Sequence, residues 1–420
     1  MSAFDIRQTA QAARDASQEL ARAGGEQKNA VLRAMAEGLL HSREQIFAVN
    51  AEDVAAARAE GLGAAFVDRL TLNLSRLEAM ARGLGQIAEL SDPVGEITGM
   101  WRRPNGLTVG RMRVPLGVIG IVYESRPNVT ADAAGLCLKS GNAVILRGGR
   151  EALRTNAAIG GILAAAVASL GLPQTSLAVV PTPDRAVVKE MLTLAGLIDL
   201  IIPRGGEALI HLVREASQIP VIAHDKGLCH TYVDAGADIA MAEEIAFNAK
   251  VERPSVCNAM ETLLVHADVA PTFLPRCVAR LAQAGVEVRG CPRTQRLVPD
   301  VMPASAQDWD TEYLDLVLSV KVVESFEEAL HHIARHGSGL AEAIVTSDHG
   351  RAMRFLREVD AGAVFVNAST RFTDGYEFGM GAEMGISTQK LHARGPMGLN
   401  ELTCQKFIVF GEGQVRDSRR

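Results

Sequence analysis

The sequence of 420 residues has no long basic run, no arginine-rich arm and no zinc-ligand spacing. Its formal net charge is -6 at pH 7, so the chain lacks the positive footprint on which nucleic-acid binding depends. We therefore expect no nucleic-acid partner and no bound metal. Solenoid architectures are also excluded, because the sequence has no short-period repeat.

Export and membrane signals are missing as well. The 6 cysteines lack the paired spacing of a disulfide framework, which is typical of a reducing cytoplasm. Residues 1–12 lack the apolar core of a secretory signal. The most apolar segment, 157–172, stops at Pro173, short of the roughly 20 residues that a membrane helix needs. We expect a cytoplasmic chain without a membrane partner.

What is present is an alternation of strand-like and helix-like runs. A hydrophobic content of 48% in this length indicates two or three domains. Residues 5–90 have a helical pattern, and 97–114 predict a hairpin with a turn at 103–106. Continuously apolar strands follow, as in parallel sheets covered on both faces. The sequence therefore predicts two α/β units, the first doubly wound and of the dinucleotide-binding type.

The expected elements fall into two blocks. In the first, strands are expected at 117–123, 143–147, 177–180 and 197–202, and helices at 130–140, 152–170 and 185–194. In the second, strands are expected at 231–233, 261–266, 286–288, 316–323, 343–346 and 363–366. The helices of the second block are expected at 241–250, 271–284, 326–335 and 350–358.

Cys257 is the strongest candidate nucleophile. It lies in a turn between an expected helix and an expected strand, on the kind of connection that often carries function. Lys250 and Arg253 lie close in sequence and would favour the thiolate, which is the nucleophilic form. Most cysteines are small buried hydrophobes, so the local pattern alone leaves burial as the alternative.

Two glycine pairs stand where nucleotide phosphates often bind. The sequence has no Gly-x-Gly-x-x-Gly after a strand and no Walker loop, but Gly148–Gly149 and Gly205–Gly206 each follow an expected strand and lead into a helix. Glycine lets the backbone approach a phosphate, and a helix N-terminus favours an anion. Arg147 and Arg150 add positive charge. A plain turn remains the alternative for each pair.

The 10 histidines show no ligand array. We expect structural or solvated roles for them, with His331 and His332 on an exposed helix. A Cys-His hydrolase is therefore only a weak alternative. Glu312 and Glu383 stand out only by their place in the chain.

Several long strings across nearly the whole chain point to one family. They are 115–128, 137–149, 202–206, 224–227, 253–258, 366–375, 379–388 and 392–398, of which 202–206 reads Ile-Pro-Arg-Gly-Gly and 224–227 reads His-Asp-Lys-Gly. Together they resemble the gamma-glutamyl phosphate reductase family of the aldehyde dehydrogenase superfamily. The resemblance implies an α/β fold with a Rossmann-type cofactor domain (1–96 and 115–228), an α/β catalytic domain (229–390) and a small β oligomerisation arm (97–114 and 400–414).

The resemblance also implies a reaction. It is the NADPH-dependent reduction of L-glutamyl 5-phosphate to L-glutamate 5-semialdehyde, with release of phosphate, in proline biosynthesis. Cys257 would attack the acyl phosphate, and the resulting thioester would be reduced. The oxyanion would be held by the N–H of Cys257 and by the amide of Asn128, although an ungapped comparison puts Glu124 at that place.

Two departures from relatives sharpen this picture. Asp225-Lys226-Gly227 stands where hydrolytic relatives carry the glutamate that activates water, so no deacylating base is evident. Arg147 and Arg150 stand where many NAD-preferring relatives have an acidic residue near the ribose. We predict that these arginines bind the 2'-phosphate and favour NADPH.

By resemblance, Lys139, Gly205 and Gly206 would line the dinucleotide site, and Glu312 would hold the nicotinamide ribose. The candidates for binding the amino-acid end of the substrate are Arg126, Asn258, Asn367 and Arg371. An arginine fork suits an α-carboxylate, while a surface or phosphate contact is the alternative for Arg371.

The arm implies a homo-oligomer, at least a dimer, and the chain carries no glutamate kinase region, so a separate glutamate 5-kinase is a candidate partner. Two alternative functions stay open. One is a related cysteine-dependent aldehyde or acyl-phosphate dehydrogenase with another substrate. The other is a non-catalytic binding protein of the same fold, which an intact Cys257 disfavours.

Overall fold

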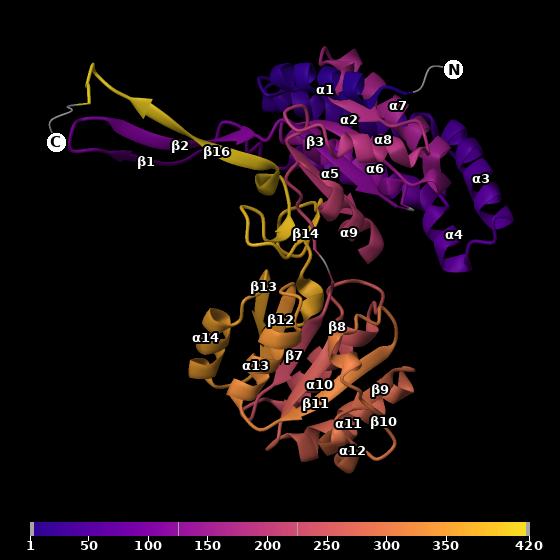
Figure 1. Ribbon diagram of the computed structural model, residues 1–420, viewed down its shortest axis with the longest axis vertical. Coiled ribbons are helices and arrows are strands. Elements are labelled where there is room, and N and C mark those ends of the chain that lie inside the picture. Colours follow the sequence, from indigo (N-terminus) through magenta and orange to yellow (C-terminus); the bar gives the residue numbers. More distant parts are fainter. Residues whose placement is uncertain (1–3, 125, 225, 417–420) are drawn as a thin grey trace. The chain divides into compact units, whose positions relative to one another are not determined.

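The computed structural model describes residues 4–124, 126–224 and 226–416, and the chain forms two compact units (Figure 1). Unit 1 comprises Met1–Ala223, Met380–Gly385 and Met397–Arg420, and unit 2 comprises His224–Gly379 and Ile386–Pro396. We expected the boundary between residues 228 and 229, five residues later. We also expected 380–385 in the second unit, whereas this segment belongs to the first.

Unit 1 begins with the expected helical region. It contains α1 (Ile6–Leu20), α2 (Gly25–His41), α3 (Arg43–Ala59), α4 (Ala64–Leu70) and α5 (Leu74–Glu89). Asp5 and Asn73 cap α1 and α5, because each side chain accepts a hydrogen bond from a backbone N–H of the first turn. The apolar stripe of α1 (Ile6, Ala10, Ala13) packs into the core below the sheet strands.

A parallel sheet forms the centre of unit 1. Its strands β3 (Val118–Tyr123), β4 (Ala143–Arg147), β5 (Leu177–Val179) and β6 (Leu200–Arg204) lie in the order β5-β4-β3-β6. The helices between and after them are α6 (Asn128–Lys139), α7 (Leu153–Ser169), α8 (Arg185–Met191) and α9 (Glu207–Ala216). Strand order reverses between β3 and β6, and ligands of such sheets bind at that point, outside the carboxyl ends.

One helical stretch of unit 1, Arg150–Ser169, is long and apolar enough to cross a membrane. Half of the most apolar part of this stretch is buried inside the protein. Within it, Ile159, Leu163 and Val167 are fully buried and face the core of unit 1.

A three-stranded antiparallel sheet extends from unit 1 and is called the arm here. It consists of β1 (Ile97–Arg102), β2 (Thr108–Pro115) and β16 (Thr403–Phe410), in the order β1-β2-β16. The expected hairpin at 97–114 is therefore confirmed, with Gly106 at φ +89° in its turn. In Figure 1 the purple hairpin runs beside the yellow C-terminal strand.

Unit 2 is built on a seven-stranded parallel sheet. Its strands, in spatial order, are β10 (Met302–Pro303), β9 (Glu287–Gly290), β11 (Val317–Val323), β8 (Met260–His266), β7 (Cys229–Val233), β12 (Ala341–Val345) and β13 (Ala363–Val366). Its helices are α10 (Ile239–Val251), α11 (Ala270–Gln283), α12 (Pro292–Leu297), α13 (Phe326–His336) and α14 (His349–Glu358). One apolar core includes α10 and α11, and another includes α13 and α14, so both faces of the sheet are covered. Two short strands, β14 (Gly385–Ser387) and β15 (Gly395–Met397), precede the arm strand β16.

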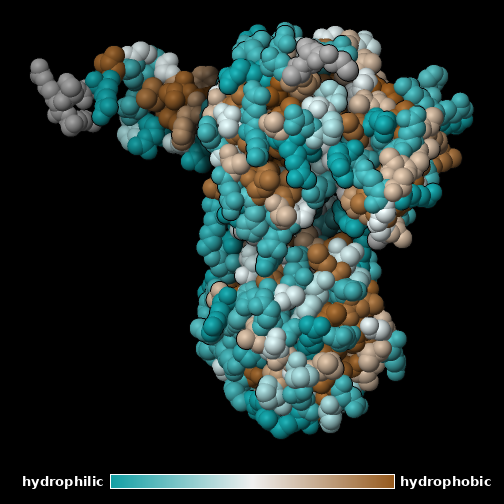
Figure 2. Space-filling model, turned by 45° about the vertical axis from the view of Figure 1, so that its right-hand side comes forward, coloured by the Kyte–Doolittle hydropathy of each residue, from teal (hydrophilic) through white to brown (hydrophobic). Residues whose placement is uncertain are grey.

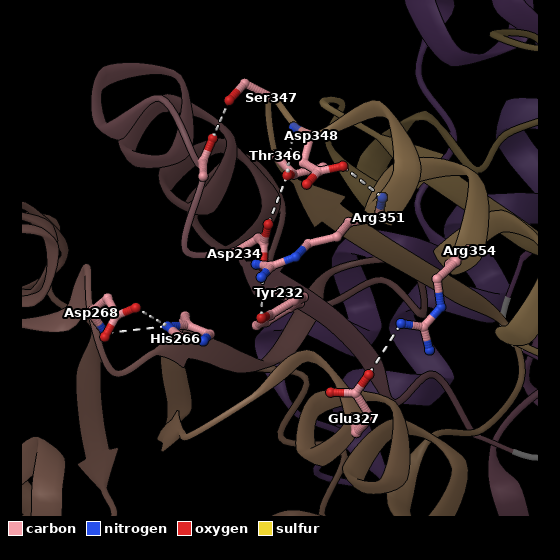
Figure 3. Close-up of polar contacts among 11 residues, drawn as sticks. Tyr232, Asp234, His266, Asp268, Glu327, Thr346, Ser347, Asp348, Arg351 and Arg354 are labelled. Carbon is pink, nitrogen blue, oxygen red and sulfur yellow. Dashed lines mark hydrogen bonds and ion pairs between the residues drawn. The ribbon is translucent and has the colours of Figure 1, made fainter.

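The carboxyl edge of this sheet is fastened by one buried carboxylate, shown in Figure 3. Asp234 follows β7 and accepts hydrogen bonds from Tyr232 Oη at 2.9 Å, Thr346 Oγ1 at 2.8 Å and Arg351 Nη1 at 2.6 Å. Burial would raise the pKa of Asp234, but these hydrogen bonds lower it below its ordinary value. The network ties the ends of β7 and β12 to α14.

His332 corrects one expectation. It lies on α13, as expected, but its side chain is buried rather than exposed, beside the rings of His230, Trp309 and His336. Burial lowers the pKa of His332 far below its ordinary value, so the imidazole is neutral at physiological pH.

Candidate active site

The cofactor candidates of unit 1 gather at one edge of its sheet. Residues 124–128 follow β3, residues 147–150 end and follow β4, and Gly205–Gly206 follow β6. Because these strands are parallel, all three connections lie at the carboxyl edge. The connections after β3 and β6 flank the point where strand order reverses, which is where a dinucleotide binds in doubly wound sheets.

The start of α9 has the properties of an anion site. Gly206 is its N-cap residue, and the N–H of Gly206 donates to Glu124 Oε2 at 3.0 Å. A Cβ on Gly206 would meet nothing within 4 Å, whereas one on Gly205 would lie 2.4 Å from Glu124 Oε2. The helix start thus holds a carboxylate in close approach and has open space beside it, which fits the pyrophosphate of a dinucleotide.

Both arginines near the expected ribose site have partners within unit 1. Arg147 Nη2 donates to the carbonyl of Pro183 at 3.1 Å, and burial lowers the pKa of Arg147 while the charge of Glu151 raises it. Arg150 is exposed and pairs with Glu60 Oε2 at 2.7 Å. An exposed ion pair of this kind is weak, so Arg150 can exchange Glu60 for another anion.

Asn128 begins α6, and its side chain is held in place by a neighbour one turn along. Its Nδ2 donates to Asp132 Oδ2 at 3.0 Å. Burial raises the pKa of Asp132 to about 6, while this hydrogen bond and the charge of Arg204 lower it. A side-chain amide carries two N–H donors, and the bond to Asp132 uses one of them.

Lys139 lies far from this edge. It ends α6, at the opposite end of the helix from Asn128, and only 1% of the residue is exposed. Its Nζ donates to the side chain of Asn29 and to the carbonyl of Ala88 at 3.0 Å. These contacts join α6 to α2 and α5, so the geometry gives Lys139 a structural place and no support for the dinucleotide contact that we expected.

In unit 2, Cys257 lies in the turn between α10 and β8, as the sequence pattern indicated. It is one of the less buried cysteines, half-buried against the apolar side chains around Cys229, Leu340 and Ala363. Cys229 opens β7 and pairs with Met260 in β8, so Cys257 lies ahead of the amino edge of the sheet. Cys257 is therefore partly exposed and lies on the connection between α10 and β8.

Gly227, just before β7, and Cys229, the first residue of β7, contact the backbone of Cys257. A Cβ on Gly227 would lie 2.2 Å from the carbonyl oxygen and 2.5 Å from the Cα of Cys257. Cys229 Sγ donates to the same carbonyl oxygen at 3.3 Å. Gly227, in the segment where we expected no water-activating glutamate, thus lies directly against the backbone of Cys257, while Asp225 lies outside the described residues.

Asn258 and Arg371, both expected to bind substrate, contact each other. Arg371 Nη1 donates to Asn258 Oδ1, and Arg371 Nε donates to Glu252 Oε2 at 2.6 Å. Asn258 Nδ2 donates to the carbonyl of Thr373 at 2.8 Å. These bonds join Asn258, the residue after Cys257, to the turn around η4 (Thr370–Phe372).

Lys250, which we expected to favour the Cys257 thiolate, is engaged elsewhere. Its Nζ lies 2.6 Å from Glu261 Oε2, and both side chains are essentially unexposed. Burial lowers the pKa of Lys250 and raises the pKa of Glu261 to about 7. Glu261 Oε1 also accepts the N–H of Leu314 at 3.2 Å, which fastens the segment that contains Glu312.

Glu312 and Cys257 therefore lie at the same edge of the sheet. The hydrogen bond from the Leu314 N–H to Glu261, at the start of β8, places the segment that contains Glu312 at the amino edge. Leu314, two residues on, has a φ of +55°, a conformation that L-residues with side chains rarely adopt.

Asn367 lies at the carboxyl edge of the unit 2 sheet, opposite the edge that Cys257 precedes. It follows β13, beyond its carboxyl end, with a φ of +55°. Its side chain accepts the N–H of Thr346 at 2.9 Å and donates to the carbonyl of Thr346 at 3.0 Å. The geometry gives Asn367 a role in joining β13 to β12, and a contact with substrate stays a prediction.

Sequence reasoning assigned no role to Gly227, Glu261 or Thr370, although Gly227 and Thr370 lie within two of the strings that carry the family resemblance. Their contacts could not be read from the sequence, because folding brings together Gly227 with Cys257, Glu261 with Lys250, and Thr370 with Asn258. Arg126 is exposed in the connection after β3. In the part of the chain that the structure describes, no group of three His, Cys, Asp or Glu side chains could hold a metal ion.

Comparison with known proteins decides the family. The model of the aldehyde dehydrogenase family matches residues 1–296 and 295–408. Gamma-glutamyl phosphate reductase from Caldanaerobacter subterraneus subsp. tengcongensis is 55% identical over 98% of this chain and 100% of its own. The chain belongs to the aldehyde dehydrogenase family, among the gamma-glutamyl phosphate reductases.

Two further relatives agree. Gamma-glutamyl phosphate reductase from Geotalea daltonii is 56% identical over 98% of each chain. The crystal structure of gamma-glutamyl phosphate reductase from Thermotoga maritima superposes with a TM-score of 0.97 at 46% identity, covering 99% of this chain and 100% of that one. The expected aldehyde dehydrogenase-like α/β fold is confirmed, and the chain is an oxidoreductase of a family that uses nicotinamide dinucleotides.

Proposed function

We propose that this chain reduces L-glutamyl 5-phosphate to L-glutamate 5-semialdehyde with NADPH, releasing phosphate, as a step of L-proline biosynthesis. The observation that carries the proposal is the half-buried thiol of Cys257 at the amino edge of unit 2, in a chain matching gamma-glutamyl phosphate reductases over 98% of its length. A cytoplasmic location and coupling to a separate glutamate 5-kinase are parts of the same proposal.

Cys257 performs the covalent step. Its thiolate attacks the carbonyl carbon of the acyl phosphate, the bond to the phosphate oxygen breaks, and phosphate leaves with the electron pair. A reduced dinucleotide, when bound, would supply the hydride that converts the thioester into an aldehyde and releases the Cys257 thiolate. The N–H of Cys257 and the amide of Asn128 are the proposed donors to the carbonyl oxygen when it carries negative charge.

We propose a preference for NADPH because Arg147 and Arg150 are positively charged. The open N-terminus of α9 at Gly205–Gly206 suits the pyrophosphate, and Arg147 and Arg150 would meet the 2'-phosphate of NADPH. Arg150 would release Glu60 to do so, a small cost for an exposed pair. Glu312 is the proposed ligand of the nicotinamide ribose.

The amino-acid end of the substrate needs a cation for its α-carboxylate. Arg126 and Arg371 are the proposed partners of the carboxylate. Asn367 is a further candidate for binding the substrate, although its side chain already bonds to Thr346. Arg371 already contacts Glu252 and Asn258, so its contact with substrate would use the guanidinium donors that these bonds leave.

We also propose that the arm joins copies of the chain into at least a dimer. The arm carries exposed apolar side chains, visible as the brown patch on it in Figure 2. They include Met100, Trp101, Phe407, Val409 and Phe410, of which Phe407 is 63% exposed. A two-edged, three-stranded sheet with apolar residues on both faces is protected when another copy covers it.

The test of the reaction runs it backwards. Purified protein is assayed for reduction of NADP+ by glutamate semialdehyde, with and without inorganic phosphate, and Cys257→Ser is assayed beside it. The proposal expects activity that requires phosphate and falls at least about 1,000-fold in Cys257→Ser. Activity without phosphate would favour a related dehydrogenase with another substrate, and no activity in the unaltered protein would contradict the proposal.

A further inference from the structure

We propose that Gly227, Asn258 and Thr370 are positioning residues that clamp the peptide of the nucleophile from two sides, so that the Sγ and the N–H of Cys257 keep one orientation. The inference deepens the proposed function and rests on Cys257 being its nucleophile. All the contacts that carry it lie within unit 2.

One side of the clamp is steric. Gly227 is buried, and any side chain there would overlap the carbonyl oxygen, Cα and carbonyl carbon of Cys257 at 2.2, 2.5 and 2.7 Å. Real Cβ atoms do not approach backbone this closely, so the backbone of Cys257 rests directly on residue 227. The S–H of Cys229, two residues on, holds the same carbonyl oxygen at 3.3 Å.

The other side is a set of hydrogen bonds to the residue after the nucleophile. Thr370 Oγ1 donates to the carbonyl of Asn258 at 2.8 Å, and Asn258 Nδ2 donates to the carbonyl of Thr373 at 2.8 Å. Arg371 Nη1 donates to Asn258 Oδ1. Asn258 is 6% exposed and Thr370 is 0% exposed, so water competes little for these bonds.

The position of the Cys257 backbone affects the reaction because it orients both the Sγ and the N–H of this residue. The Cα of Cys257 directs the thiolate, and the adjoining peptide carries the N–H that faces the developing oxyanion. Catalytic groups must be held within about 0.5 Å of their productive geometry, and a displacement of about 1 Å can cost about 100-fold in rate. The clamp supplies that precision on a connection rather than on a helix or strand.

This assigns Asn258 a different task from binding the substrate. Its amide oxygen and nitrogen are both used within the protein, toward Arg371 and Thr373. A substrate ligand would mainly change KM when altered, whereas a positioning residue changes kcat and leaves KM near its value.

Thr370→Val gives the cleanest test, because valine keeps the shape and removes only the hydroxyl. The control is Thr294→Val, since Thr294 is also fully buried in unit 2 and donates its hydroxyl to a backbone carbonyl, that of Val320, at 3.1 Å. We expect kcat to fall roughly fivefold to tenfold in Thr370→Val with KM unchanged, and recovery in Thr370→Ser. Both valine variants should lose similar stability, and Thr294→Val should keep its kcat.

A second readout needs neither substrate nor cofactor. The rate at which iodoacetamide alkylates Cys257 is measured by mass spectrometry of the peptide that contains it. Because this rate depends only on the thiol and its surroundings, the result can be interpreted even if the proposed reaction is wrong. We expect Gly227→Ala to change the alkylation rate at least about tenfold, and Gly236→Ala, whose Cβ meets nothing closer than 3.5 Å, to leave it unchanged. Folded Gly227→Ala and Thr370→Val proteins with the unaltered alkylation rate and kcat would overturn the inference, as would a rise in KM alone.

Discussion

Lys250 Nζ and Glu261 Oε2 lie 2.6 Å apart, with 0% and 1% of their side chains exposed, immediately before and after the turn that carries Cys257. The pair closes the base of that turn. Through Glu261 Oε1 it also holds the N–H of Leu314, and with it the connection that bears Glu312.

Removing one partner of this pair should therefore be costly. Lys250→Met leaves the Glu261 carboxyl buried without its cation, and the expected loss in the free energy of unfolding is about 3–5 kcal/mol. Replacing both, with Lys250→Met and Glu261→Leu, should restore part of that loss because no lone charge remains. Urea unfolding of the three variants measures this; equal stability of the single variant and the unaltered protein would contradict it.

Asp132 makes stability depend on pH. Burial raises its pKa in the folded chain to about 6, against about 3.9 for an unfolded aspartate. Between these values the folded state binds more protons than the unfolded state, so this group lowers stability as pH rises from about 4 to about 6, with no further change above. Asp132→Asn should remove that slope, as measured by urea unfolding at a series of pH values. Parallel pH profiles of the two proteins would contradict the prediction.

The pairing of Arg150 with Glu60 gives two opposite predictions for cofactor choice. Arg150→Glu should lower the ratio of kcat/KM for NADPH over NADH at least about tenfold, because a negative charge would face the 2'-phosphate. Glu60→Gln should raise that ratio, since Arg150 loses its competing partner. An unchanged ratio in Arg150→Glu would remove Arg150 from the cofactor site.

The arm should control assembly. Phe407→Asp puts a charge on an apolar, 63% exposed position of the edge strand β16, and we expect a shift toward monomer in multi-angle light scattering. Leu356→Asp is the control, because Leu356 is 42% exposed on α14 and outside the arm. A monomer before any substitution would contradict the assembly proposal.

The strands of both sheets could be predicted from the sequence where turns bound an apolar run. β4 (Ala143–Arg147) and β13 (Ala363–Val366) begin and end where the pattern indicated. The predicted start of β6, at Leu197, was three residues too early. Leu197 and Ile198 are apolar but belong to a turn, in which the N–H groups of both donate to the carbonyl of Leu194. A buried turn and a buried strand look alike in hydrophobicity alone.

The charged residues of the site were less predictable. Lys139 was expected to line the dinucleotide site, and Lys250 to favour the Cys257 thiolate. Both are buried, and they bond to partners 51 residues and 11 residues away. Sequence spacing carries no information on such partners, because tertiary packing chooses them. The glycine pairs and Asn128, at the start of α6, follow carboxyl ends of strands in unit 1, where a strand-helix alternation predicts ligand sites. Cys257 lies ahead of the amino edge of the unit 2 sheet, which that rule does not predict.

The central claim is that Cys257 carries the glutamyl group as a thioester that phosphate, and not water, resolves. The most direct measurement incubates the protein with glutamate semialdehyde and NADP+ and follows the absorbance of NADPH before and after adding inorganic phosphate. The account predicts a burst of about one equivalent of NADPH per active site, then sustained turnover only when phosphate is present, and neither in Cys257→Ser. Sustained turnover without phosphate, or a burst in Cys257→Ser, would contradict it.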